Sequence, residues 1–285
     1  MPDKETTFSE MGFLSQRVKR TVATFHNENQ PWVALYYKLN RLGHEQYDCL
    51  PKRSKDARGL LISNNFYRVL ISYQSAFLLI EVGNDIDAKG MMRNAMDSLF
   101  TLAALVKDKA FTEKYVRADE DGRLNRLNSM INGCKAQIGR TEGWYLTKEF
   151  IVEPSQMVEL ETEKKALEAE SKQNPKWVAS RDIKISEVAD KAGMGLAYKV
   201  GYKHLCLYAH PSPSGTSDFL QTDNAGNITG FKIGQMDHSA KGNMGVAICT
   251  LLDALKATAE YLNQDRTTEL DEFYAELEAL RNEKC

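Results

Sequence analysis

The residues best suited to acid–base chemistry lie between Leu196 and Gly215, where a predicted amphipathic helix runs into a Pro-Ser-Pro turn. An α-helix advances about 100° per residue, so Lys203 and His210 fall on nearly the same line of its surface. Pro211 places His210 at the C-terminal end of this helix, beside carbonyls without helical partners, where the helix dipole favours a protonated imidazole. Because histidine is the side chain that changes charge near neutral pH, this segment is the predicted reactive centre.

Three neighbouring residues could assist His210. His204 and Tyr208, four residues apart, share a second line of the same helix, and Ser212 follows in the turn. We expect Tyr208 to orient a bound phosphate, with His204 and Ser212 in supporting positions. The alternative is structural, because a histidine at the end of a helix commonly caps the free carbonyls and the Pro-flanked serines can simply stop the helix.

A second candidate pair is Arg93 and Asp97, four residues apart on a predicted apolar helix. Facing outward, they would form an intrahelical ion pair in solvent. Facing inward, Arg93 would lie between Met92 and Met96 and offer its planar guanidinium to an anion or to the end of another helix. The two methionines themselves are interpreted as ordinary core residues.

Sequence patterns for other chemistries are missing. The chain has no H-x-x-x-H or H-E-x-x-H pattern for a metal, no glycine-rich loop ending in Lys-Ser or Lys-Thr for a nucleotide, and no G-x-S-x-G around a nucleophilic serine. No metal or cofactor site is therefore expected.

Composition restricts the class of protein and its partners. The 37 Lys and Arg residues nearly balance 39 Asp and Glu residues in a chain of 285, which argues against a surface for duplex DNA but leaves room for a local basic pocket. The five cysteines are scattered and odd in number, as in reduced cytoplasmic proteins. The polar N-terminus does not resemble a secretory signal, and the apolar runs are shorter than the roughly 20 residues that cross a bilayer. A soluble cytoplasmic protein without a membrane segment is predicted.

Apolar residues recur at helical spacing through most of the chain. Helices are predicted over about 8–27, 31–42, 60–82, 85–107, 111–134, 154–173, 183–193, 196–210, 240–263 and 268–281, those at 60–82 and 85–107 packing antiparallel. Residues 43–58 lack this periodicity and are predicted to form a loop. The Glu- and Lys-rich segment at 154–173 is interpreted as a solvated helix held by ion pairs.

One short segment departs from the helical pattern. Residues 216–234 contain two strand-like runs joined by an Asn/Gly turn, which predicts a β-hairpin. The predicted fold class is therefore mainly α, a multi-helix bundle with a small β-hairpin appendage. Residues 1–58 would supply N-terminal helices and the polar loop, and residues 59–285 the bundle, the two forming one cooperative body.

Three segments together resemble the bacterial family called domain of unknown function 5677. They are Arg93-Asn94-Ala95-Met96-Asp97, residues 111–128, and residues 177–212, which end in Tyr-Ala-His-Pro-Ser. The resemblance covers about residues 66–217. It implies an acidic residue four positions after the arginine, usually Glu but here Asp97, and a helix that ends in His-Pro-Ser.

A looser resemblance is to the HEPN superfamily of helical nucleases and nucleotide-binding proteins. Its mark is an arginine followed, after four to six residues, by a histidine on one helix. Lys203 and His210 have this spacing, with lysine in the place of arginine. Lysine is a point charge and cannot hold a phosphate through two parallel hydrogen bonds.

Two functions from different classes follow. In the first, the chain is a metal-independent ribonuclease of the HEPN type: His210 transfers a proton, Lys203 or Arg93 stabilises the phosphorane, and Tyr208 orients the phosphate. The resemblance extends this function to phage defence or toxin action, with RNA or another anionic ligand as partner. In the alternative, the chain is a helical interaction protein or an anionic-ligand-binding module that docks a protein partner or forms a homo-oligomer.

Overall fold

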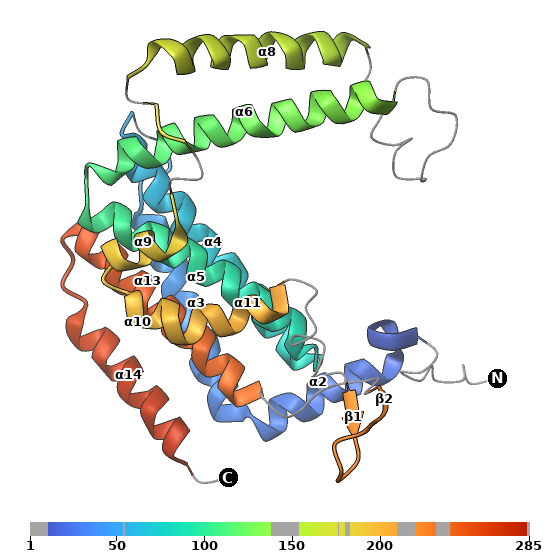
Figure 1. Cartoon of the computed structure of the whole chain (residues 1–285). Helices are drawn as coiled ribbons and strands as arrows, with labels where there is room; N and C mark the ends of the chain where they lie inside the picture. Colours follow the sequence, from blue (N-terminus) through green and yellow to red (C-terminus); the bar gives the residue numbers. More distant parts are fainter. Residues whose placement is uncertain are drawn as a thin grey trace. The chain divides into compact units, whose positions relative to one another are not determined.

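The computed structural model describes residues 11–53, 55–137, 154–175, 177–179, 183–209, 220–231 and 240–283. It divides the chain into two compact units, Met1–Lys109 with Val188–Cys285, and Ala110–Glu187. The described part is mainly helical with one small sheet, which confirms the predicted fold class (Figure 1). In chain order its elements are η1 (Gly12–Leu14), α2 (Gln16–Glu28), α3 (Gln30–Cys49), α4 (Ala57–Glu81), α5 (Asp85–Lys107), α6 (Phe111–Gln137), α8 (Pro154–Gln173), α9 (Ile185–Lys191), α10 (Gly195–Ala197), η3 (Tyr198–Tyr202), α11 (Lys203–Ala209), β1 (Leu220–Thr222), β2 (Ile228–Phe231), α13 (Ala240–Leu262) and α14 (Thr267–Asn282).

The helices α4 and α5 form the centre of the first unit. Between them the chain reverses at Gly83, whose φ of 76° is a left-handed conformation that favours glycine. At the start of α4, Arg58 donates hydrogen bonds of 2.8 and 2.6 Å to the Leu105 and Val106 carbonyls at the end of α5. The two helices are therefore antiparallel, as the sequence predicts.

A pair of buried tyrosines joins α3 to α4. The Tyr36 hydroxyl donates to the Tyr73 carbonyl at 2.6 Å, and the Tyr73 hydroxyl donates to the Tyr36 carbonyl at 2.9 Å. The two rings stack with their centroids 3.8 Å apart. Burial raises the pKa of both phenols, so each remains a neutral donor that satisfies a main-chain oxygen of the other helix.

Helix α3 is longer than the sequence indicates. It ends at Cys49, so the loop predicted over residues 43–58 is wrong in its first part. The buried line of α3 continues from Leu39 and Leu42 through Gly43 and Gln46, which is completely buried. Glycine and glutamine are not counted as apolar residues. The apolar periodicity in the sequence therefore ends before the helix does. At Gly43 an added Cβ would lie 2.7 Å from Leu70 Cδ1 of α4, so close packing explains the glycine.

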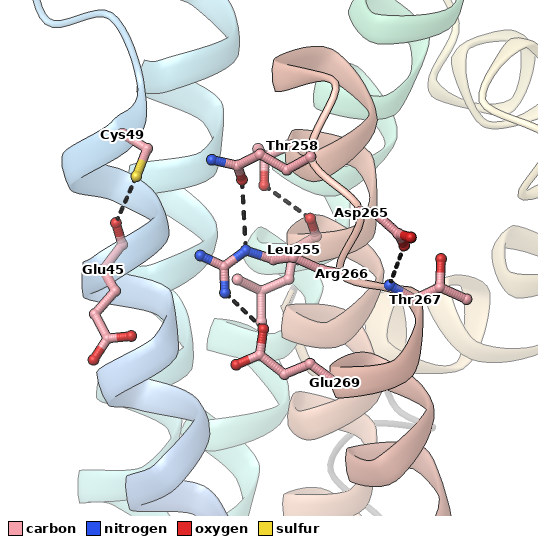
Figure 2. Close-up of polar contacts among 9 residues, drawn as sticks. Glu45, Cys49, Leu255, Thr258, Asp265, Arg266, Thr267 and Glu269 are labelled. Atoms are coloured by element: carbon pink, nitrogen blue, oxygen red, sulfur yellow. Dashed lines mark hydrogen bonds and ion pairs between the residues drawn. The ribbon is translucent and has the colours of Figure 1, made fainter.

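The first unit is completed by α13, which packs against α3, α4 and α5, and by α14, which packs against α13 and α3. Figure 2 shows the connection between α13 and α14. There the main-chain N–H of Thr267 donates to Asp265 at 3.1 Å, and Arg266 forms an ion pair with Glu269 at 2.7 Å. Asn263, with a φ of 54°, turns the chain at the end of α13. These local contacts lie at the start of α14.

The second unit consists mainly of α6 and α8, which run side by side (Figure 1). Ion pairs join the two helices, Arg117 to Glu170 at 3.0 Å and Lys135 to Glu161 at 2.7 Å. Because residues early in α6 meet residues late in α8, the helices are antiparallel. The prediction of a helix held by ion pairs over residues 154–173 is confirmed.

The sheet has two antiparallel strands, with Leu220 of β1 opposite Phe231 of β2. The turn between them contains Gly226 with a φ of 85°, and Asp223 accepts hydrogen bonds from the main chain of Ala225 and Asn227. This is the predicted hairpin. Among the described helices, none combines the length and apolar character needed to cross a bilayer.

Candidate functional site

The predicted site residue Arg93 lies on α5, opposite the helical segment formed by α10, η3 and α11. Phe100, near the C-terminal end of α5, packs against Tyr198 with ring centroids 6.4 Å apart. Near its N-terminal end, Lys89 Nζ lies 3.9 Å from the ring centroid of Tyr208. The segment therefore runs antiparallel to α5, with Arg93 in the middle of the contact.

Arg93 contacts both helices. Its Nη2 donates to the Tyr202 hydroxyl at 2.9 Å, and its Nη1 lies 3.1 Å from Asp97 Oδ2. Its Nε is buried without a hydrogen-bond acceptor, although 25% of the side chain is exposed. Cys206, whose side chain helps to raise the pKa of Arg93, completes the group that we name the Arg93 cluster: Arg93, Asp97, Tyr202 and Cys206.

The intrahelical ion pair forms, and the guanidinium also reaches a neighbouring helix.

The electrostatics of the cluster follow from its partial burial. Burial raises the pKa of Asp97, and the neighbouring Tyr202 hydroxyl and the charges of Arg93 and Arg68 only partly oppose it. Burial and the neighbouring Asp97 carboxylate raise the pKa of Tyr202, which stays a neutral phenol. Burial disfavours the charged form of Arg93, but Asp97, Cys206 and Tyr202 together raise its pKa. The cluster thus holds a permanently charged guanidinium at the junction of two helices.

The segment opposite α5 is not a uniform α-helix. Residues Tyr198–Tyr202 form a wider π-helical turn between α10 and α11, and the Tyr198 and Tyr202 rings stack 5.3 Å apart. A π-turn changes which residues face a neighbouring helix and is frequent at functional sites. Here it lies at the Arg93 contact, because its last residue, Tyr202, accepts the hydrogen bond of Arg93.

The other predicted residues of this segment divide between its two faces. Tyr208 faces α5 through Lys89, whereas Lys203 and His204 are exposed. Lys203 Nζ lies 5.7 Å from the ring centroid of Tyr198, and the His204 ring meets Tyr208 edge-on at 5.5 Å.

His210 and Ser212 lie outside the described residues. The pocket predicted from Arg93, Lys203, Tyr208 and His210 therefore remains a prediction.

Three members of the site were not predicted. Tyr202 and Cys206 belong to the apolar face of their helix in the sequence, and Lys89 resembles any surface lysine. The spacing of Tyr202 and Cys206, four residues apart, indicates that they share a face. Nothing in the sequence indicates that this face meets Arg93.

A second cluster, also in the first unit, uses the same four residue types. Between α13 and α14, the Tyr274 hydroxyl donates to Asp253 at 2.8 Å, and Arg281 Nη2 lies 3.4 Å from Cys249 Sγ. We name these residues the Arg281 cluster: Cys249, Asp253, Tyr274 and Arg281. Arg281 also forms an ion pair with Glu278 of its own helix at 2.9 Å.

Within the ranges that the structure describes, no three His, Cys, Asp or Glu side chains are grouped as a metal ion would need.

Comparison with known proteins gives one match. Residues 60–228, more than half of the chain, match the model of the family of unknown function DUF5677. The chain belongs to this family. No curated protein and no solved structure matches it.

Only one of the two clusters lies within the part of the chain that matches the DUF5677 family model. All of the Arg93 cluster, together with Lys89 and Tyr208, lies within residues 60–228. The Arg281 cluster begins at Cys249 and lies beyond the match. The Arg93 cluster thus lies in the part of the chain that the family model covers, and the Arg281 cluster lies outside it.

Proposed function

We propose that this DUF5677 chain is a ribonuclease that cleaves RNA without a metal ion, and that the Arg93 cluster binds the scissile phosphate. The observation that carries the proposal is an excess of positive charge. Arg93 of α5 lies 3.1 Å from Asp97, and Arg68 of α4 is near enough to act on the pKa of Asp97. Two cations thus lie near one carboxylate, an arrangement that favours an anionic ligand.

The proposed reaction is an internal transesterification. The 2′-oxygen of a ribose forms a bond to phosphorus, the bond from phosphorus to the 5′-oxygen breaks, and a cyclic 2′,3′-phosphate results. Arg93 would donate hydrogen bonds to the non-bridging oxygens and stabilise the charge of the phosphorane.

The proton transfers are assigned to His210, which follows the last residue of α11 directly in the sequence. His210 would take the proton of the 2′-hydroxyl or protonate the leaving oxygen. Tyr208 would orient the phosphate, and Asp97 and Ser212 would support these groups. Lys203 and His204 lie on the exposed face of the helix and take no part in this reaction.

The experiment is cleavage of a fluorescent single-stranded RNA in the presence of EDTA. We expect Arg93→Ala to lower kcat/KM about 100-fold or more, the typical effect of removing a donor to the transition state. His210→Ala should abolish cleavage while the melting temperature stays within a few degrees. Arg281→Ala is the matched control, because it removes an arginine from the same four residue types, and it should keep activity within about 3-fold of wild type.

Two outcomes would contradict the proposal. One is a wild-type protein that leaves RNA intact under these conditions. The other is equal activity in the Arg93→Ala and Arg281→Ala variants.

A role in the cell follows from the same proposal. A ribonuclease of this kind would act in the cytoplasm as a toxin or in phage defence, where cleavage of cellular RNA stops growth. Induced expression of the wild-type chain should then arrest bacterial growth, and expression of Arg93→Ala to the same level should not. If both proteins arrest growth, toxicity does not depend on RNA cleavage, and the proposed role in the cell is contradicted.

A further inference from the structure

One face of α10, η3 and α11 is exposed along its whole length. Its residues are spaced three or four positions apart along the helix, as on one helical face. We name them the outer stripe: Leu196, Lys199, Val200, Lys203, His204 and Leu207. Leu196 is 76% exposed and Val200 is 67% exposed. Apolar side chains at helical spacing on a surface are typical of a face that receives another element.

The helix cannot turn this stripe inward, because its other face is already used. Tyr202 and Leu205 are buried, Tyr202 accepts the hydrogen bond of Arg93, and Tyr208 lies under Lys89. The exposure of Leu196 and Val200 is therefore a consequence of how α5 fixes the segment.

The charge of the stripe has one sign. No Asp or Glu occurs in the sequence between Asp190 and Asp218, whereas Lys199 and Lys203 lie directly beside the apolar residues. A second copy docked face to face would bring these lysines against each other, which disfavours a symmetric dimer through this face. A bilayer surface would receive only three apolar side chains, fewer than helices that lie in a membrane interface present.

We propose that the outer stripe docks an amphipathic α-helix of a partner protein, with leucine-like residues at intervals of three and four and Asp or Glu beside them. Leu196, Val200 and Leu207 would interdigitate with the apolar residues of that helix. Its carboxylates would lie near Lys199 and Lys203, which selects against basic helices and speeds association.

The probe is a designed helical peptide with leucine at every third or fourth position and glutamate beside each leucine, labelled for fluorescence polarisation against the full chain. A second peptide has lysine in place of each glutamate. We expect the glutamate peptide to bind at least 10-fold more tightly than the lysine peptide. Val200→Glu should weaken the glutamate peptide at least 10-fold.

The matched control is Leu78→Glu, which introduces the same charge at an apolar residue of α4 that is 59% exposed. It should leave peptide binding unchanged. Lys199→Glu should reverse the preference toward the lysine peptide. If Val200→Glu proves unfolded by circular dichroism, Leu196→Glu tests the same face.

The proposal is independent of RNA cleavage, because Val200→Glu should cleave RNA at the wild-type rate. Equal binding of the two peptides, or equal binding by wild type and Val200→Glu, would overturn it. So would competition of single-stranded RNA with the peptide, which would assign the stripe to RNA. Binding to anionic lipid vesicles that Val200→Glu abolishes would assign the stripe to a membrane surface and overturn it equally.

Discussion

The Arg93 cluster and the Arg281 cluster join two helices with the same four residue types, but they arrange them differently. In the Arg93 cluster the arginine and the aspartate share one helix, and the tyrosine accepts a hydrogen bond from the arginine. In the Arg281 cluster the aspartate and the arginine are on different helices, and the tyrosine donates directly to the aspartate.

The surrounding charges differ as well. Asp97 lies near Arg93 and Arg68, whereas Lys256 lies near Asp253 and Arg281 lies near Glu278. One cluster has an excess of positive charge and the other is balanced. Charge excess, rather than the kinds of residue present, therefore distinguishes a candidate anion site from a contact that only holds helices together.

The largest stability effect should fall on the balanced cluster. Tyr274→Phe removes a hydrogen bond to a carboxylate and should lower the free energy of unfolding by about 2 kcal/mol. Tyr202→Phe should cost only about 1 kcal/mol, because Asp97 keeps its ion pair with Arg93. Urea unfolding of the wild type and the two variants measures both values. A larger loss of unfolding free energy in Tyr202→Phe than in Tyr274→Phe would mean that the Arg93 cluster contributes more to stability than the Arg281 cluster.

Removing the carboxylate should affect anion binding at one cluster only. Asp97→Asn increases the charge excess and should raise the affinity for a short single-stranded RNA about 3- to 10-fold. Asp253→Asn should leave this affinity unchanged. Binding is measured with His210→Ala as background, so that the RNA stays intact. A similar gain in both variants would mean that only net charge matters.

The salt dependence of RNA binding should identify the cations that contact phosphate. Each phosphate contact with a single strand contributes about 0.7 to the slope of log K against log salt concentration. Lys89→Ala should lower the slope by about this amount, and Lys256→Ala, which removes a lysine near Asp253, should leave it unchanged. A change in both would place RNA on both clusters.

The smallest effect concerns pH. Burial raises the pKa of Asp253, so its contribution to stability is full below the ordinary pKa of about 3.9 and is lost as pH rises through the raised value. Relative to Asp253→Asn, the wild type should therefore be more stable near pH 4 than near pH 7.

Asp265 is the control for this measurement, because its contribution to stability should change with pH in the opposite direction. The hydrogen bonds from Thr267 lower the pKa of Asp265, so its contribution to stability is lost as pH falls. Relative to Asp265→Asn, the wild type should lose stability toward low pH. The same sign for both aspartates in urea titrations would contradict the assigned cause.

The central helices could be predicted closely because their burial repeats in the sequence. The expected ranges 60–82 and 85–107 compare with α4 at Ala57–Glu81 and α5 at Asp85–Lys107. Apolar residues spaced three and four positions apart, followed by Gly83, are sufficient for that prediction. The end of α3 could not be predicted, because Gly43 and Gln46 occupy buried positions without being apolar.

The candidate site was predicted only where its residues share one helix. Arg93 and Asp97 are four apart, so their contact follows from helical geometry. Tyr202 is 109 positions from Arg93 in the chain, and their hydrogen bond depends on how two helices pack. The π-turn at Tyr198–Tyr202 also lacks a sequence signal that helical periodicity would detect.

By itself, the sequence determined the helical class, the antiparallel pair α4 and α5, the ion-paired helix α8 and the hairpin, because each depends on residues close together in the chain. Only the tertiary structure decided that Arg93 meets Tyr202 and Cys206, that Lys89 covers Tyr208, and that Leu196 and Val200 remain outside. The physical reason is that helical periodicity fixes which residues share a face. Which faces meet is decided by packing among all the helices of the unit together.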